Sequence, residues 1–206
     1  MLGRLKFEID PLVEEMLDRI PEEMFVSDTT TFLDPAMGGG QFIKGLISRL
    51  RKYSHSDDNI ASRITGYENN KMRIQFAVNK YNLIGTFEAK DFLENDMSKK
   101  FDVILGNPPF QSDGGGSSIK LWKKFIIQSA KVVEKNGIIS MVTPISWSKP
   151  TRGIAKGDDQ KMLDVMYNNT IIKTNMDTNS FFSGVGINTG YWIMRLDGTK
   201  SDTLYF

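Results

Sequence analysis

The sequence predicts an α/β fold in which a mostly parallel, twisted sheet carries helices on both faces. Short β-rich runs alternate with segments whose apolar residues recur at helical spacing, a pattern typical of strands joined by crossover helices. Three predicted strands in succession end in an acid or an amide, and open α/β sheets bind ligands at the carboxyl ends of their strands. The 206 residues, 40% of them hydrophobic, suffice for one packed core, so we expect a single domain over residues 1–206.

Composition excludes several kinds of site. The chain has no cysteine, which removes disulfides, thiolate metal sites and cysteine nucleophiles. The one histidine, His55, has no second histidine beside it, so we expect a surface residue and no metal. No apolar run reaches membrane-spanning length and the first residues lack a signal-peptide pattern. We therefore expect a cytoplasmic protein.

The first predicted element is a helix. Asp10 followed by Pro11 is a helix-start signal, because aspartate caps the free N–H groups and proline fits the first helical position. The apolar residues that follow share one face and predict a packing helix that leads into the site: Leu12, Val13, Met16, Leu17 and Ile20.

A strand at Thr30–Leu33 is followed by Asp34, a glycine-rich turn and a second helix. Gly38 and Gly40 let the backbone approach a ligand at the helix N-terminus. No Lys-Ser or Lys-Thr follows the glycines, and no third glycine lies in register, so the pattern fits neither a P-loop nor a dinucleotide fingerprint. Because the Asp34 carboxylate would repel a pyrophosphate, we expect a ligand with a positive charge there.

The next two strands, predicted at 63–68 and 83–90, also end in acids. Glu68 lies where Rossmann-like sites place a carboxylate that accepts from ribose hydroxyls, although an acid at a helix N-terminus is the alternative. Asp91 can accept from an adenine amino group while Phe92 packs on the base. A helix-capping aspartate is the alternative for Asp91.

The fourth strand, Phe101–Gly106, stops at Asn107-Pro108-Pro109-Phe110. Two prolines fix two φ angles and supply no N–H, so the turn is stiff and its carbonyls are free to accept. A carboxamide, a rigid carbonyl and an aromatic ring together favour binding of a planar, amine-bearing group such as a nucleobase. A turn that merely ends a strand remains the alternative.

The rest of the chain predicts a polar loop at 111–118, a helix from Ile119 that ends at Asn136-Gly137, and a strand at 138–143. A helix beginning at Asp158, a strand at 170–176 and an antiparallel pair at 191–196 and 203–206 follow. The segment 119–161 holds nine basic and three acidic residues, which offers a path for a polyanion. Its irregular part, 144–157, includes Trp147, which we expect to be exposed. This part is either a plain loop or a nucleic-acid contact.

These motifs together resemble S-adenosylmethionine-dependent adenine-N6 DNA methyltransferases. Residues 34–42 (DPAMGGGQF) resemble the first motif of that family, and residues 107–110 match its catalytic NPPF form. The order of the two motifs suits the arrangement called gamma, and residues 181–188 resemble the late aromatic motif. Met37, Gly39 and Gln41 replace the usual cysteine, serine and asparagine of the first motif.

The resemblance implies a Rossmann-like class I methyltransferase fold, with a seven-stranded, mostly parallel sheet and an antiparallel last strand. It implies S-adenosylmethionine as cofactor, and catalysis by Asn107, Pro108, Pro109 and Phe110. The expected substrate-binding residues are Trp147, Lys149 and Phe182. The expected cofactor-binding residues are Asp34, Ala36, Gly38, Gly40, Phe42, Glu68, Asp91, Phe92 and Asn107.

The implied activity is methylation of the 6-amino group of adenine in DNA, as in restriction-modification. Two methyltransferase alternatives share the motif, one acting on an RNA guanine amine and one on a protein glutamine amide. A non-catalytic Rossmann-like module that binds nucleic acid is a third. No separate target-recognition domain is evident in the sequence, so the expected partners are DNA, or RNA, and a subunit or further C-terminal region that recognises the target.

Overall fold

The computed structural model describes residues 8–94, 98–111, 120–148, 155–178, 181 and 188–200. Within these residues the strands form one seven-stranded sheet with the order β3-β2-β1-β4-β5-β7-β6. The strands are β1 (Phe32–Asp34), β2 (Ile64–Glu68), β3 (Thr86–Ala89), β4 (Phe101–Gly106), β5 (Val133–Pro144), β6 (Thr170–Asn175) and β7 (Thr189–Arg195).

The sheet is parallel from β3 to β5 and antiparallel around β7. β1 pairs in parallel with β2 and with β4, and β4 pairs in parallel with β5. β7 runs antiparallel to both of its neighbours, β5 and β6. The predicted fold class, with its antiparallel last strand, is confirmed, whereas the strand predicted at 203–206 lies outside the described residues.

Helices cover both faces of this sheet. They are α1 (Pro11–Arg19), α2 (Glu23–Val26), α3 (Gln41–Lys52), α4 (Asp57–Arg63), α5 (Lys71–Tyr81), α6 (Leu121–Val132) and α7 (Asp158–Tyr167), with a 3₁₀ turn, η1 (Ile145–Ser148). In the described part of the chain, none of them is long and apolar enough to cross a membrane.

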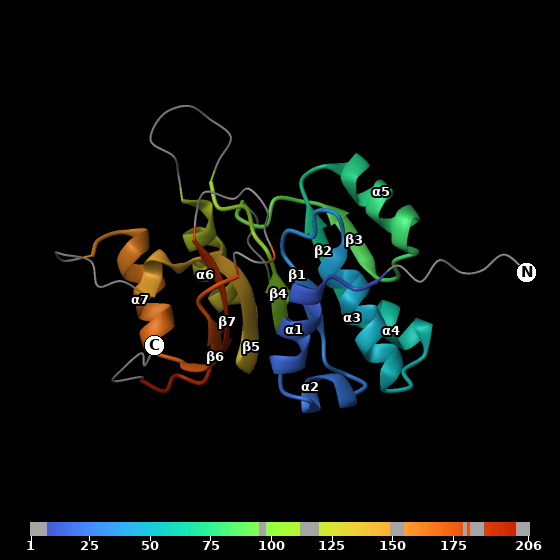
Figure 1. Cartoon of the computed structure of the whole chain (residues 1–206), viewed down its shortest axis with the longest axis horizontal. Coiled ribbons are helices and arrows are strands. Elements are labelled where there is room, and N and C mark those ends of the chain that lie inside the picture. Colours follow the sequence, from blue (N-terminus) through green and yellow to red (C-terminus); the bar gives the residue numbers. More distant parts are fainter. Residues whose placement is uncertain are drawn as a thin grey trace, which may run out of the picture.

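Two hydrophobic cores lie on opposite faces of the sheet. One core combines side chains of α1 to α5 with alternate strand residues such as Phe32 and Leu105. The other combines α6 and α7 with the intervening residues, such as Leu33 and Ile104. In Figure 1, α6 and α7 lie toward the end of the sheet that holds β5, β7 and β6, and α3, α4 and α5 toward the end that holds β1, β2 and β3. Central strands buried on both faces are typical of parallel sheets.

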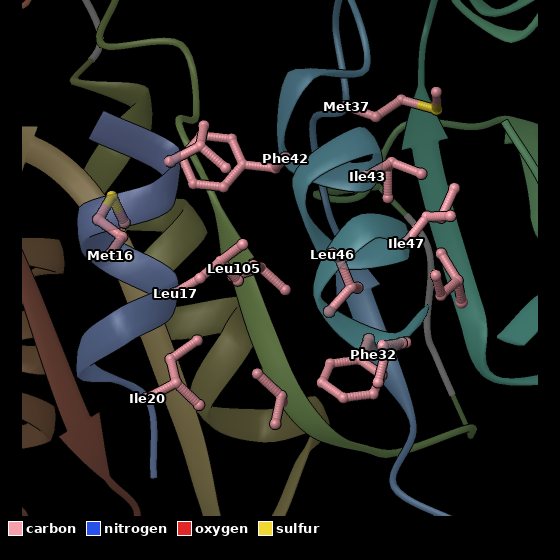
Figure 2. Close-up of a cluster of buried hydrophobic side chains, with 14 of the residues drawn as sticks. Met16, Leu17, Ile20, Phe32, Met37, Phe42, Ile43, Leu46, Ile47 and Leu105 are labelled. Atoms are coloured by element: carbon pink, nitrogen blue, oxygen red, sulfur yellow. The ribbon is translucent and has the colours of Figure 1, made fainter. Parts of the chain in front are cut away.

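Helices α1 and α3 lie side by side over β1 and β4, and Figure 2 shows their apolar side chains turned toward those strands. The predicted start of α1 is confirmed, since Asp10 Oδ1 accepts from the Leu12 N–H at 2.9 Å and Pro11 is the first helical residue. This packing fixes the N-termini of α1 and α3 at the same end of the sheet as the C-termini of β1 and β4.

Two predicted boundaries are wrong. The polar segment 51–62 predicts a helix end followed by an exposed loop; the helix end is confirmed, since α3 ends at Lys52, but the rest contains most of α4, whose N-cap Ser56 accepts from the Asn59 N–H at 3.2 Å. His55 there is half-buried, and its Nε2 lies 2.7 Å from the Phe25 carbonyl oxygen.

Asn136-Gly137, expected to end a helix, lies inside β5, because α6 already ends at Val132. Asn136 has a φ of 65°, and a Cβ on Gly137 would lie 2.7 Å from the Asp102 carbonyl oxygen. The two residues therefore form an irregularity in the strand, where the β4–β5 register shifts.

Candidate active site

The polar ends of three neighbouring strands meet at one edge of the sheet. β1 ends at Asp34, β2 at Glu68 and β4 at Gly106, which is followed by Asn107. Because β1 lies between β2 and β4 and all three are parallel, their carboxyl ends face the same way. This is the edge at which open α/β sheets bind ligands.

The glycine turn between β1 and α3 requires its glycines. Gly38 and Gly40 have φ angles of 50° and 80°, a region that residues with a Cβ rarely adopt. A Cβ on Gly40 would also lie 2.7 Å from Leu83 Cδ1. Gly40 is the N-cap of α3 and supplies no side-chain cap, so the first N–H groups of α3 remain available to a ligand.

Two cavities meet beside this turn. The larger, about 490 Å³, falls within the range of small-molecule sites. The smaller is about 260 Å³. Ala36, Gly38 and Asn107 line both cavities, so they mark the junction. Predicted cofactor-binding residues that line the larger cavity are Ala36, Gly38, Glu68, Asp91, Phe92 and Asn107, and Phe42 lines the smaller one.

Two carboxylates face the larger cavity from adjacent strand ends. Glu68 Oε1 accepts from the Asn70 N–H at 3.0 Å, and Glu68 Oε2 lies 3.7 Å from Arg73 Nη1. Asp91 Oδ1 accepts from the Leu93 N–H at 2.8 Å. A carboxylate can accept several hydrogen bonds at once, so the chemistry of both side chains suits hydroxyl or amino groups of a ligand.

Asp34 is placed differently. Its side chain is only 1% exposed and lines neither cavity. Its Oδ1 accepts from the Ala36 N–H at 3.1 Å, and a Cβ on Gly106 would lie 2.8 Å from that oxygen. Burial, against the lowering effect of the Ala36 N–H and with a smaller contribution from the charge of Glu68, raises the pKa of Asp34 to about 7.

The tetrapeptide after β4 reaches both cavities through one side chain. Asn107 is exposed and lines both cavities, and Pro109 lines the larger one. Pro108 is buried, and Phe110 is half-buried and packs against both hydrophobic cores. Asn107 therefore presents its carboxamide at the junction, while its neighbours hold the turn in place.

The expected exposure of Trp147 is wrong. Its side chain is 3% exposed and belongs to the core under α6 and α7, together with Met162 and Met166. The chain continues from β5 directly into η1, and this turn directs the indole inward. Trp147 is therefore not available for the substrate contact expected of it. Lys149 and Phe182 lie outside the described residues.

Several lining residues were missed by the sequence analysis. Arg73 and Asn69 line the larger cavity from the start of α5, and Leu121 and Phe125 line it from α6. Asp10 and Gln41 line the smaller cavity. The polar pair Asn69-Asn70 directly after β2 is a sequence signal that could have indicated Asn69 as a lining residue.

Comparisons with known proteins agree with this geometry. Residues 41–182 match the family model described as Eco57I restriction-modification methylase. A curated relative, the type II methyltransferase M.CvrRI of Paramecium bursaria Chlorella virus XZ-6E, is 29% identical over 145 residues, which cover 65% of this chain. Those residues cover 35% of the viral protein, so the chain spans about a third of that relative's length.

Solved structures share the fold at low identity. The M protein of the type I restriction enzyme EcoKI superposes with a TM-score of 0.71 at 14% identity, over 97% of this chain and 46% of that protein. A Listeria monocytogenes protein described as a class I S-adenosylmethionine-dependent methyltransferase superposes with a TM-score of 0.67 at 15% identity, over 94% and 60% of the two chains.

Proposed function

Since the chain belongs to the Eco57I restriction-modification methylase family, we propose that it transfers a methyl group from S-adenosylmethionine to the exocyclic 6-amino group of adenine in DNA. The observation that carries the proposal is the position of Asn107 at the junction of two cavities. One cavity has the size and the carboxylates for a nucleoside, and the other extends from it along the glycine turn.

The residues present fit this cofactor. Glu68 would accept from the ribose hydroxyls and Asp91 from the adenine amino group, with Phe92 in the wall of the same cavity. Gly38 lines both cavities and has a positive φ, so the backbone can approach the ligand there, while Gly40, which lines neither cavity, lets the turn pack against Leu83. Asp34 would hold the turn through the Ala36 N–H. These residues bring the reacting end of the cofactor to Asn107.

Asn107 and Pro108 would prepare the substrate amine. The lone pair of an adenine amino group is delocalised into the ring, which makes the nitrogen a poor nucleophile. The Asn107 side-chain oxygen and the Pro108 carbonyl would accept its two hydrogens and favour a tetrahedral nitrogen. S-adenosylmethionine, when bound, supplies an electrophilic methyl group. No strong base is needed, because the proton departs after the methyl group has arrived, so catalysis rests on positioning and electrostatics.

Phe110 would stack on the target base, which must leave the duplex to reach such a pocket. A phenylalanine rather than a tyrosine at this position favours a base over an amide substrate. Restriction-modification methylases act on DNA, and the family match supports DNA as the polymer. We propose that residues 1–206 form one catalytic domain, and that a partner subunit or another region recognises the target sequence.

Replacement of Asn107 by alanine tests the proposal. We expect Asn107→Ala to lower the methyl-transfer rate by about 10²- to 10³-fold, the usual cost of removing one transition-state hydrogen-bonding group. Asn79→Ala is the matched control, because Asn79 is exposed on α5. Transfer of radiolabelled methyl groups to DNA measures both. Full transfer by Asn107→Ala would remove the central role of this residue.

The same assay separates the substrate classes. DNA, RNA and protein are each offered as acceptor, and the modified residue is identified by mass spectrometry. We expect N6-methyladenine from DNA. A methylated guanine amine from RNA or a methylated glutamine would assign the same catalytic turn to another substrate. Absence of S-adenosylmethionine binding in calorimetry would instead support a non-catalytic module.

A further inference from the structure

The outer face of α5 carries two apolar side chains that remain largely exposed. Met72 is 78% exposed and Phe76 is 62% exposed, and these are the most exposed large hydrophobic residues in the described part of the chain. Because they are four residues apart, they lie one above the other on the same face of the helix. Exposed apolar side chains that adjoin one another mark an interaction surface more strongly than single ones do.

The core does not explain these two side chains. The inner face of α5 packs through Ile74 and Ala77, which are buried, whereas Met72 and Phe76 do not belong to that core. The helix is therefore apolar on both of its faces. A helix with this pattern is typically covered on both faces, so we expect the outer face of α5 to be covered as well.

Positive charge flanks the exposed apolar pair. Residues 71–81 hold three basic residues and no acidic one. We define the α5 patch as the exposed side chains of Lys71, Met72, Phe76 and Lys80. Lys80 Nζ lies 5.5 Å from the centre of the Phe76 ring, so a cation is located directly beside the apolar pair. Neither lysine pairs with an acid among the described residues.

This combination of side chains favours one kind of partner. An apolar pair between cations is complementary to an amphipathic helix that has apolar residues at helical spacing and acidic residues beside them. In a symmetric contact between two copies of this chain, the patch would meet itself and its cations would repel each other. A DNA backbone would use the cations and leave Met72 and Phe76 in water, whereas methionine and phenylalanine are enriched in protein–protein interfaces.

We propose that the α5 patch binds an acidic amphipathic helix of a partner protein. Met72 and Phe76 pack between the apolar side chains of that helix, and Lys71 and Lys80 pair with its carboxylates. The inference goes beyond the proposed function and does not depend on it, because none of these four residues lines either cavity of the candidate active site.

Two fluorescently labelled helical peptides of about 20 residues test the proposal. Both have leucine at helical spacing, and the remaining positions are glutamate in one and lysine in the other. In anisotropy titrations with the whole protein, the glutamate peptide should bind at least about tenfold more tightly. Met72→Ser combined with Phe76→Ser should weaken its binding by about 10- to 100-fold. Lys71→Glu combined with Lys80→Glu should reverse the preference between the two peptides.

Val26→Ser is the matched control, because Val26 is 57% exposed on α2, which lies well away from α5 in Figure 1. It should leave peptide binding unchanged. All the replaced side chains are exposed, so the variants should fold, and thermal unfolding checks this. If the glutamate peptide does not bind, or binds the Met72→Ser and Phe76→Ser variant as tightly as the unaltered protein, the proposal is overturned.

Two other results would assign the patch to a different occupant and would also overturn the proposal. One is a dimer in sedimentation that the Met72→Ser and Phe76→Ser variant no longer forms, which would identify a second copy of the chain. The other is loss of duplex DNA binding in the Lys71→Glu and Lys80→Glu variant without any peptide binding. Arg73 is unchanged in every variant because it lines the larger cavity.

Discussion

The two halves of the sheet on either side of β4 differ at the edge where the parallel strands end. The half from β1 to β3 is open to a cavity there, and the half from β5 to β7 is closed. On the β1 to β3 side, strand ends carry Glu68 and Asp91, which face a cavity. On the β5 to β7 side, the corresponding edge is closed by buried hydroxyl contacts. The Trp192 indole N–H donates to Thr143 Oγ1 at 3.0 Å, and the hydroxyls of Thr178 and Thr189 lie 2.9 Å apart.

This difference separates the half of the sheet that faces the ligand cavity from the half that stabilises the fold. The closed half pairs these hydroxyl and indole groups with one another and leaves none of them for a ligand, although the buried hydroxyls of Ser129 and Ser140 have no partner among the described residues. The open half leaves carboxylate and amide oxygens that face a cavity. Substitutions in the closed half should therefore change stability, and substitutions in the open half should mainly change cofactor affinity.

The largest expected effect comes from the closed half. Trp192 is fully buried, so Trp192→Ala should lower the free energy of unfolding by about 3–5 kcal/mol. Trp192→Phe keeps most of the buried ring and should cost less. Denaturant titration measures both. If the folded Trp192→Ala variant binds S-adenosylhomocysteine tenfold more weakly than the unaltered protein, the separation of the two halves is wrong.

Asp34 should make stability depend on pH. Its folded pKa of about 7 lies above the ordinary value of 3.8, so the folded state holds more protons than the unfolded state between these values. Stability is therefore greatest below about pH 4 for this group and falls as pH rises through 7, by about 4 kcal/mol at most. Unfolding at pH 5 and pH 8 should show this fall relative to Asp34→Asn. If the stability of the unaltered protein and that of Asp34→Asn change with pH in parallel, the raised pKa of the buried Asp34 carboxyl is contradicted.

Gly40 tests the open half at its turn. Gly40→Ala places a Cβ 2.7 Å from Leu83 Cδ1 at a φ of 80°, and we expect a loss of about 1–3 kcal/mol in stability. Gly157→Ala is a matched control, because Gly157 also has a positive φ, 59°, but no atom lies within 4 Å of its added Cβ. Gly157→Ala should lower stability by less than Gly40→Ala does, and it should leave cofactor affinity unchanged in calorimetry.

The open half was largely predictable from sequence. Glu68, Asp91 and Asn107 each follow a strand-like run directly, and parallel strands bring such ends to one edge without any knowledge of tertiary packing. The closed half was not predictable in this way. Whether Trp147 points outward or into the core depends on how α6 and α7 pack over it, and the irregular sequence around Trp147 shows no periodicity that indicates this packing.

Asp10 shows a second limit of sequence analysis. Its position before Pro11 identified it correctly as a helix cap, and that role accounts for the residue completely at the level of local structure. Its place in the smaller cavity arises only because α1 packs beside α3 at the C-terminal edge of β1 and β4. The spacing of residues along the chain does not indicate that α1 and α3 make this contact.

The smallest expected effect concerns an ion pair in the open half. Arg73 Nη1 lies 3.7 Å from Glu68 Oε2, and the Arg73 side chain is 58% exposed. Exposed pairs contribute about 0.2–1 kcal/mol, so Arg73→Ala should weaken S-adenosylhomocysteine binding by about twofold in calorimetry, and less at high salt. Arg51→Ala removes a similarly exposed pair with Asp57 away from the cavities and should have no effect on binding. A loss above tenfold for Arg73→Ala would mean that the guanidinium contacts the ligand itself, and the open half would then hold its cofactor by a cation as well as by carboxylates.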